Sequence, residues 1–136
     1  MEDIQILVDT IFPLIKKLIT QYQEFYPIAI VINNYGETLQ IGYYDGNDHP
    51  TSKDLMEDLV VEMRSNQLNY RTIAIFYDVK LTEHETGNRI DAIAVHTENK
   101  NNSNAFTFYY PYELVDEYSI IIKSAWKELS KRKVFD

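Results

Sequence analysis

The stretch IAIFYDVKLTEHETGNRIDAIAV, residues 73–95, carries the clearest structural signal in this chain. Its two halves alternate apolar residues with others, and the turn-like segment EHETGN separates them. The alternating positions are Ile73, Ile75, Tyr77, Val79 and Leu81 in the first half and Ile90, Ala92 and Ala94 in the second. A period of two is typical of β-strands, and a short loop containing glycine is typical of hairpins. The stretch therefore predicts an antiparallel hairpin.

The register of this hairpin follows from its loop. If residues 84–87 form a four-residue loop, Glu83 lies opposite Asn88 and all the alternating apolar side chains share one face of the sheet. Lys80 then lies opposite Asp91, and an oppositely charged cross-strand pair contributes about 0.2–1 kcal/mol.

The segments on either side predict three helices and three more strands. The apolar spacing favours helices over residues 4–26, 51–67 and 114–129, and strands over PIAIVIN, over 38–43 and over AFTFYYPY. The prediction of the last helix is based on the i, i+3 and i+4 spacing of apolar residues, which are Leu114, Val115, Tyr118, Ile121, Ile122, Ala125, Trp126 and Leu129. Pro13 is unfavourable inside a helix, so we expect a kink there or a start nearer Ile11.

These elements predict one α+β domain over residues 1–136, with the order α-β-β-α-β-β-β-α. Because hairpin connections dominate, we expect a single five-stranded, mainly antiparallel sheet with helices on its faces. This element order resembles the roadblock and longin group of profilin-like domains. The resemblance implies a non-enzymatic scaffold or regulator of partner proteins.

Composition excludes several classes of function. The chain has 136 residues and no cysteine, which excludes disulfides, thiol nucleophiles and cysteine-based metal sites. Its 21 acidic and 13 basic residues give a net charge of −8, which opposes nucleic-acid binding and favours a basic protein partner. The N-terminus lacks the basic region of a signal peptide, and no apolar run is long enough to span a membrane. We therefore expect a cytoplasmic protein.

The basic residues cluster near the C-terminus, at Lys123, Lys127, Lys131, Arg132 and Lys133. We interpret them as cations at the end of the predicted final helix, where the macrodipole favours positive charge.

The stretch YYDGNDHPTSKDL, residues 43–55, resembles a binding loop but fails as a calcium site. An EF-hand loop needs glycine at its sixth position and glutamate at its twelfth, where this chain has Pro50 and Met56. Thr51 and Asp54 instead form the pattern of a helix N-cap, with Ser52 as an alternative cap. The alternative function is a contact with a partner through an aromatic and acidic group formed by Tyr43, Tyr44, Asp45, Asp48 and His49.

Four other residues are candidates for catalytic or metal-binding groups. His96 and Glu98 share one face of a strand, but with no third ligand we expect a polar edge on a half-buried strand rather than a metal site. Asp78 and Asp91 could act as a general acid and base only if they lay opposite each other, which the hairpin register denies. The glycines at 36, 42, 46 and 87 build no phosphate-binding motif. We expect no metal and no cofactor.

Eleven tyrosines are many for a chain of this length. Tyrosine is enriched at protein interfaces, because its ring can be buried while its hydroxyl keeps a hydrogen bond. It is also common in antiparallel sheets, so both interpretations stay open. The candidates for partner contact at the predicted strand ends are Tyr43, Tyr44, Tyr109, Tyr110 and Tyr112.

The segments FYPIAIVINNYGE, YDGNDHPTSKDL, IAIFYDV, IDAIAVHTE and YYPY resemble a family of small bacterial proteins with no assigned activity. The pattern shared with that family covers Tyr77, Asp78, Val79, Asp91, Ala92, Ile93, Val95, Glu98, Pro111 and Tyr112. The family provides no catalytic residue to carry over to this chain. Small acidic α+β proteins of this kind also resemble immunity proteins that neutralise bacterial toxins.

We therefore expect a non-enzymatic protein-binding module, of toxin-immunity type, that forms a two-fold dimer. The main alternative is a homodimeric regulatory scaffold of the profilin-like kind. A second alternative is a small hydrolase that uses Asp78, Asp91 or His96, which would require a deep pocket lined by at least two of these side chains.

Overall fold

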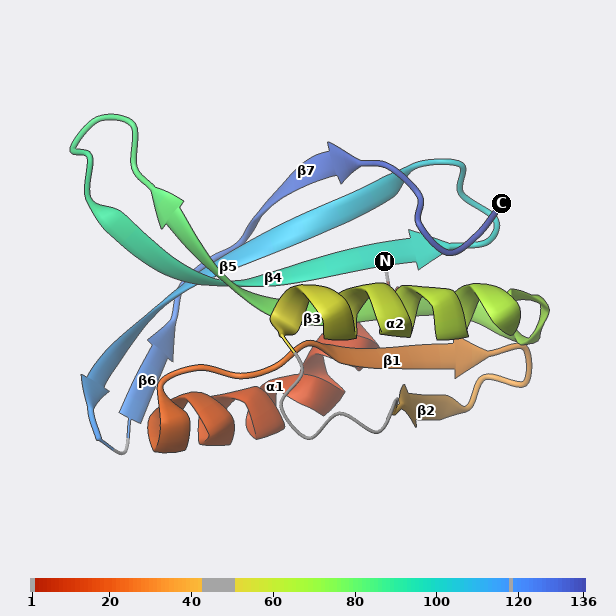
Figure 1. The fold of residues 1–136 in the computed structure, drawn as a ribbon, viewed down its shortest axis with the longest axis horizontal. Coiled ribbons are helices and arrows are strands. Elements are labelled where there is room, and N and C mark those ends of the chain that lie inside the picture. Colours follow the sequence, from red (N-terminus) through yellow and green to blue (C-terminus); the bar gives the residue numbers. More distant parts are fainter. Residues whose placement is uncertain (1, 43–50, 118) are drawn as a thin grey trace.

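The computed structural model describes residues 2–42, 51–117 and 119–136. Within them the chain forms two α-helices, one short 3₁₀ helix and seven strands (Figure 1). In chain order these are α1 (Glu2–Tyr22), β1 (Ile28–Asn33), β2 (Thr38–Ile41), α2 (Ser52–Ser65), η1 (Gln67–Asn69), β3 (Tyr70–Thr82), β4 (Arg89–Asn99), β5 (Ala105–Asp116), β6 (Ser119–Ile122) and β7 (Trp126–Ser130). The chain is thus α+β, as predicted.

The strands form one curled, antiparallel sheet in the order β2-β1-β3-β4-β5-β6, with β7 also paired to β5. The N-terminal part of β5 pairs with β7 and its C-terminal part pairs with β6. Figure 1 shows β4, β5 and β7 arching away from the two helices. The far side of β5 is therefore bordered by two short strands instead of one long one.

The predicted hairpin is confirmed as β3 and β4. Lys80 lies opposite Asp91, and their side chains form an ion pair at 2.6 Å. The Glu83 N–H donates to the Asn88 carbonyl at 2.8 Å, which closes the predicted loop. Gly87 has a φ of 72°, a left-handed conformation that glycine adopts without strain.

One face of the sheet packs against α1. Five apolar residues of the helix, three or four positions apart in sequence, pack against the inward-facing side chains of β1, β3 and β4. They are Leu7, Val8, Ile11, Ile15 and Ile19, and they contact Ile30, Ile32, Ala74, Phe76, Ile93 and Val95. Phe12 adds an edge-to-face contact with Tyr110 of β5, with ring centroids 4.9 Å apart.

The opposite face packs against α2 and the end of the chain. Leu59 and Met63 of α2 are buried against β1 and β3, and Val134 and Phe135 complete this second core. Figure 1 shows the chain end returning from β7 towards the C-terminal half of α2. The sheet is therefore covered on both faces over β1 and β3.

The predicted final helix is wrong. Residues 114–117 and 119–129 contain the end of β5 and the strands β6 and β7, so the sheet has seven strands in the described part of the chain instead of five. Ser119–Ile122 contains three consecutive isoleucines, whose β-branched side chains favour strands. The end of the element order therefore departs from the roadblock-like pattern.

The first helix runs without interruption through Pro13 and begins at Glu2, so the alternative start near Ile11 is wrong. It ends at Tyr22, where the Gln23 N–H donates to the Ile19 carbonyl at 2.7 Å. Gln23 has a φ of 64°, the left-handed conformation that commonly ends helices. The buried apolar residues on both sides of Pro13 outweigh its missing hydrogen bond.

The N-cap predicted for α2 is confirmed. Thr51 is extended, and its hydroxyl oxygen accepts a hydrogen bond from the Asp54 N–H at 3.0 Å. Gly46 and Pro50, in the same connection, lie outside the described residues.

We predict that Thr51→Ala lowers the free energy of unfolding by about 0.5–2 kcal/mol, because the Asp54 N–H loses its partner. Chemical denaturation measures this loss. Ser52→Ala is the matched control and should be close to neutral, since Thr51 supplies the cap. If Thr51→Ala is as stable as the wild type, the double variant Thr51→Ala with Ser52→Ala decides the result. A less stable double variant identifies Ser52 as a substitute cap, and a double variant as stable as the wild type contradicts the assignment.

Candidate functional site

The most unusual polar group of the fold is the carboxylate of Glu98 on β4. Its side chain is 0% exposed, and it binds three consecutive backbone N–H groups at the chain end. Lys133 donates to Oε2 at 2.8 Å, Val134 donates to both oxygens at 3.2 Å, and Phe135 donates to Oε1 at 3.0 Å. A buried carboxylate is costly unless such donors surround it. Glu98 therefore anchors the end of the chain.

His96 extends this network on the same face of β4. Its side chain is 1% exposed, and its Nε2 lies 2.6 Å from Glu98 Oε2. Because an ionised carboxylate only accepts hydrogen bonds, Nε2 carries the hydrogen. The hydroxyl of Ser130, at the end of β7, lies 3.4 Å from His96 Nδ1. The predicted half-buried polar edge is therefore wrong, since both side chains are fully buried.

Two side chains around α2 hold the last residues from the other side. Arg64 donates to the Lys133 carbonyl and to the Asp136 carboxylate, both at 3.0 Å. Gln67 accepts from the Asp136 N–H at 3.1 Å and donates to the Asp136 carboxylate at 3.3 Å. We call residues 131–136 the tail, and Glu98, His96, Arg64 and Gln67 together the slot.

The network determines the charge of Glu98. Burial on its own would raise the pKa of this carboxyl group, but hydrogen bonds from His96 and from the Lys133 and Phe135 N–H groups outweigh burial and lower it. Glu98 is therefore ionised in the folded chain at neutral pH. Its attachment to the tail is a set of charge-assisted hydrogen bonds, which are stronger than neutral ones.

A second polar group lies on β3, on the opposite face of the sheet from the slot. The Tyr112 hydroxyl donates to Asp78 Oδ1 at 2.9 Å. Burial raises the pKa of Asp78, and the Tyr112 hydrogen bond only partly offsets it. Burial and the charge of Asp78 raise the pKa of Tyr112 well above its usual range.

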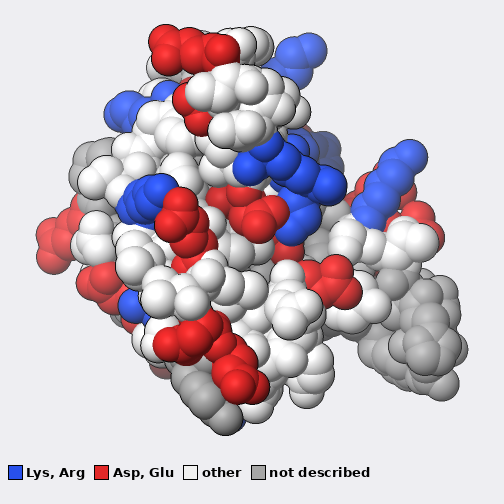
Figure 2. Space-filling view, turned by 90° about the vertical axis from the view of Figure 1, so that its left-hand side faces the viewer, with Lys and Arg blue, Asp and Glu red and all other residues white. Residues whose placement is uncertain are grey.

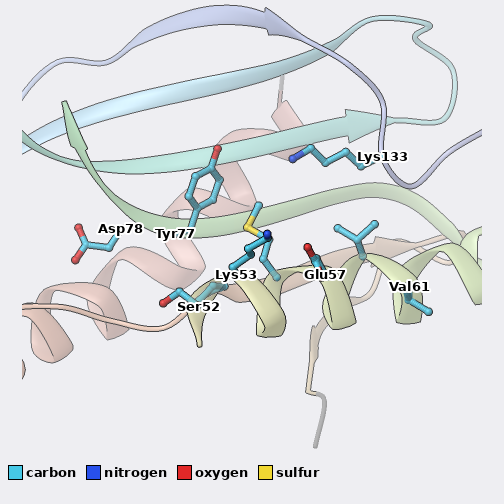
Figure 3. A pocket seen from close by; sticks show the side chains of 10 residues that line it. Ser52, Lys53, Glu57, Val61, Tyr77, Asp78 and Lys133 are labelled. Carbon is cyan, nitrogen blue, oxygen red and sulfur yellow. The ribbon is translucent and has the colours of Figure 1, made fainter. Parts of the chain in front are cut away.

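Asp78 lies where two cavities meet. The larger, about 710 Å³, lies between α2, β3 and Lys133 of the tail, with Met56, Val60 and Tyr77 among its walls (Figure 3). The second, about 530 Å³, lies beneath the end of α1 and is lined by Tyr22 and Tyr26. Ser52 and Asp78 line both. Figure 3 shows Lys133 reaching over the larger cavity from the side opposite α2.

The structure does not bring the three candidate catalytic side chains together in one pocket. Of Asp78, Asp91 and His96, only Asp78 lines either of these two cavities. Asp91 is paired with Lys80, and His96 is buried against Glu98. In the described residues no group of three or more His, Asp or Glu side chains could hold a metal ion.

The predicted partner contacts are only partly accessible. Tyr110 packs on Phe12 and Tyr109 stacks on Trp126 with ring centroids 5.4 Å apart, so both are half-buried. Tyr112 is 4% exposed and belongs to the core next to α1, so its ring is not available as an anchor. Tyr43, Tyr44, Asp45 and Asp48 lie outside the described residues.

Large apolar side chains are exposed along the β6–β7 edge, which we define as residues 114–117 and 119–129. They are Leu114, Val115, Ile121, Trp126 and Leu129. These are five of the residues from which the final helix was predicted. The apolar pattern of this segment is therefore only partly buried, since Ile120 and Ile122 pack against the core beside α1 while these five side chains stay exposed.

Charges of both signs are mixed over the end of the molecule that Figure 2 shows. Basic and acidic side chains alternate across the described part of that face, so the net charge of −8 does not produce a uniformly acidic surface there. Within the described residues, neither helix is long and apolar enough to cross a lipid bilayer.

We predict that Glu98→Gln lowers the free energy of unfolding by about 3 kcal/mol at neutral pH, because the amide offers one acceptor oxygen and turns a donor towards the tail N–H groups. The pKa of Glu98 is lowered from its ordinary value of 4.5, so the stabilisation is present above that value and is lost as pH falls through the folded pKa.

Denaturation from about pH 7 to about pH 3 measures this effect, and the difference between wild type and variant should shrink towards the acid end. A difference that stays constant over this range would show that the charge of Glu98 does not hold the tail.

We predict the opposite effect for Asp78→Asn. Folding raises the pKa of Asp78 above 3.8, so its ionised form destabilises the fold once pH exceeds the folded value. The asparagine keeps an oxygen that can accept from Tyr112, so the variant should melt at a higher temperature at neutral pH and lose this advantage in acid. Asp91→Asn is the matched control and should gain nothing, since it loses the ion pair with Lys80. A lower melting temperature for Asp78→Asn would contradict this account.

Comparison of the chain with protein-family models, with curated proteins and with solved structures gives no match. Function is therefore inferred from the surface and chemistry of this chain itself.

Proposed function

We propose that this chain is a protein-binding module that takes its partner at the β6–β7 edge. The observation that carries the proposal is the presence of five exposed large apolar side chains along this edge, on both faces of the sheet: Leu114, Val115, Ile121, Trp126 and Leu129. Single exposed apolar residues are common on protein surfaces, but a group of them along one edge is typical of an interaction site.

The backbone of this edge supports the same proposal. Among the described strands, β6 and β7 pair only with β5, so their outer N–H and C=O groups have no strand partner. Edge strands are commonly protected by charged residues or proline, and Ser119–Ile122 of β6 has neither, whereas β7 carries Lys127 and Glu128. An extended segment of a partner can add to such an edge, with main-chain hydrogen bonds for affinity and side-chain contacts for specificity.

The charge of the chain favours a basic partner. With a net charge of −8, long-range attraction speeds the encounter with a positively charged protein, while buried apolar contacts slow dissociation. A small acidic protein that binds a basic partner one to one fits the toxin-immunity type of function. In the alternative, a homodimeric scaffold, the same edge pairs with a second copy.

The test uses two exposed leucines. Leu129 is 69% exposed on β7, and Leu68 is 87% exposed on the 3₁₀ turn, away from the edge. We predict that Leu129→Lys weakens partner binding at least tenfold, a loss typical of an interface anchor, whereas Leu68→Lys leaves it unchanged. Because both side chains are solvent-exposed, both variants should fold like the wild type.

Each tagged variant is used to capture proteins from a lysate of the native host, and the retained protein is identified and titrated. A partner retained by the wild type and Leu68→Lys but lost by Leu129→Lys supports the proposal. Equal retention by all three chains contradicts it. Light scattering distinguishes the homodimeric alternative. If the wild type and Leu68→Lys have twice the mass of the 16.0 kDa monomer and Leu129→Lys has the monomer mass, that alternative is supported instead.

A further inference from the structure

We propose that the slot is an exchangeable peptide site, in which the tail of a second copy can replace the tail of the same chain. The inference does not rest on the proposed function, since it concerns β4, α2 and residues 131–136 and leaves the exposed side chains of the β6–β7 edge unchanged. Its basis is the way in which the slot holds the tail.

The slot recognises the tail as it would recognise a separate peptide. Four consecutive backbone N–H groups are bound by two side chains, with Lys133, Val134 and Phe135 donating to Glu98 and Asp136 donating to Gln67. Arg64 adds contacts to a tail carbonyl and to the Asp136 carboxylate. Arg64 and Gln67 lie 69–72 residues in sequence from the tail residues that they bind, and Glu98 lies 35–37 residues away, so none of these contacts depends on the local connection of the tail to β7.

Side-chain burial adds selectivity to these backbone contacts. Val134 and Phe135 are both buried in the core beside α2. The slot therefore selects an aliphatic residue, then an aromatic residue, then an acidic residue that Arg64 and Gln67 can bind. A second copy of this chain supplies that same sequence.

The connection between β7 and the slot is the least satisfied part of the arrangement. It consists of Lys131 and Arg132, and the Arg132 Nε is buried with no hydrogen-bond partner among the described residues, although Nη1 donates to the Asp136 carbonyl at 3.4 Å and the guanidinium lies over the Phe135 ring. A buried unsatisfied donor on a charged group is costly. A tail that enters from another copy keeps every slot contact, so exchange loses none of the hydrogen bonds that hold the tail.

The charge of the tail is opposite in sign to the net charge of the chain. The tail carries Lys131, Arg132 and Lys133 in succession, although the whole chain has a net charge of −8. Because both copies carry the same net charge they repel each other at long range, so exchange depends on the short-range contacts of the slot and not on electrostatic steering.

The test is complementation between two full-length variants. Glu98→Gln damages the slot and keeps the tail, whereas Phe135→Ala damages the tail and keeps the slot. Each variant alone should melt below the wild type. In an equimolar mixture the intact tail of one chain can occupy the intact slot of the other, so we expect a heterodimer of twice the monomer mass by light scattering and a higher melting temperature than either variant shows alone.

A mixture that behaves as the sum of its two components overturns the proposal. If one variant does not fold, a labelled peptide of sequence SKRKVFD, residues 130–136, provides the test with the wild-type chain. Saturable binding of this peptide, with a scrambled peptide bound at least tenfold more weakly, supports exchange. A wild-type chain that binds neither peptide, or both equally, overturns it.

Discussion

The carboxylate of Glu98 determines how the second half of this fold closes. A fully buried charge in a protein interior must be surrounded by donors, and here His96 and three successive tail N–H groups supply them. By binding the tail, Glu98 places Val134 and Phe135 against α2 and β3. The core on this face is thus completed by the last residues of the chain, so β4, α2 and the tail stabilise one another.

The same closure leaves one side of the sheet open. Because the chain turns back from β7 into the slot, no further element covers the far side of β6 and β7 in the described residues. The apolar side chains of that edge remain exposed, while those of β1 and β3 are covered on both faces by α1 and α2. An interior held firmly on two faces, with an apolar edge left free, is a suitable arrangement for binding another protein.

The sequence predicted the features that local interactions determine. The register of β3 and β4 followed from alternation and loop length, and the Thr51 cap followed from a four-residue pattern. Residues 114–129 were predicted wrongly because an apolar spacing of three and four indicates a helix only when one face is buried. His96 and Glu98 were recognised as a polar pair, but their burial depends on a tail some 35 residues away, which no local pattern reveals.

The most direct test of this account is native-state hydrogen exchange at the tail amides of Lys133, Val134 and Phe135. If the Glu98 carboxylate makes the tail part of the cooperative fold, these three N–H groups should exchange as slowly as core amides of β3 such as that of Ile75. In the Glu98→Gln variant their protection should fall much further than that of Ile75. Tail amides that exchange freely in the wild type at neutral pH, while β3 stays protected, would contradict the central role of Glu98.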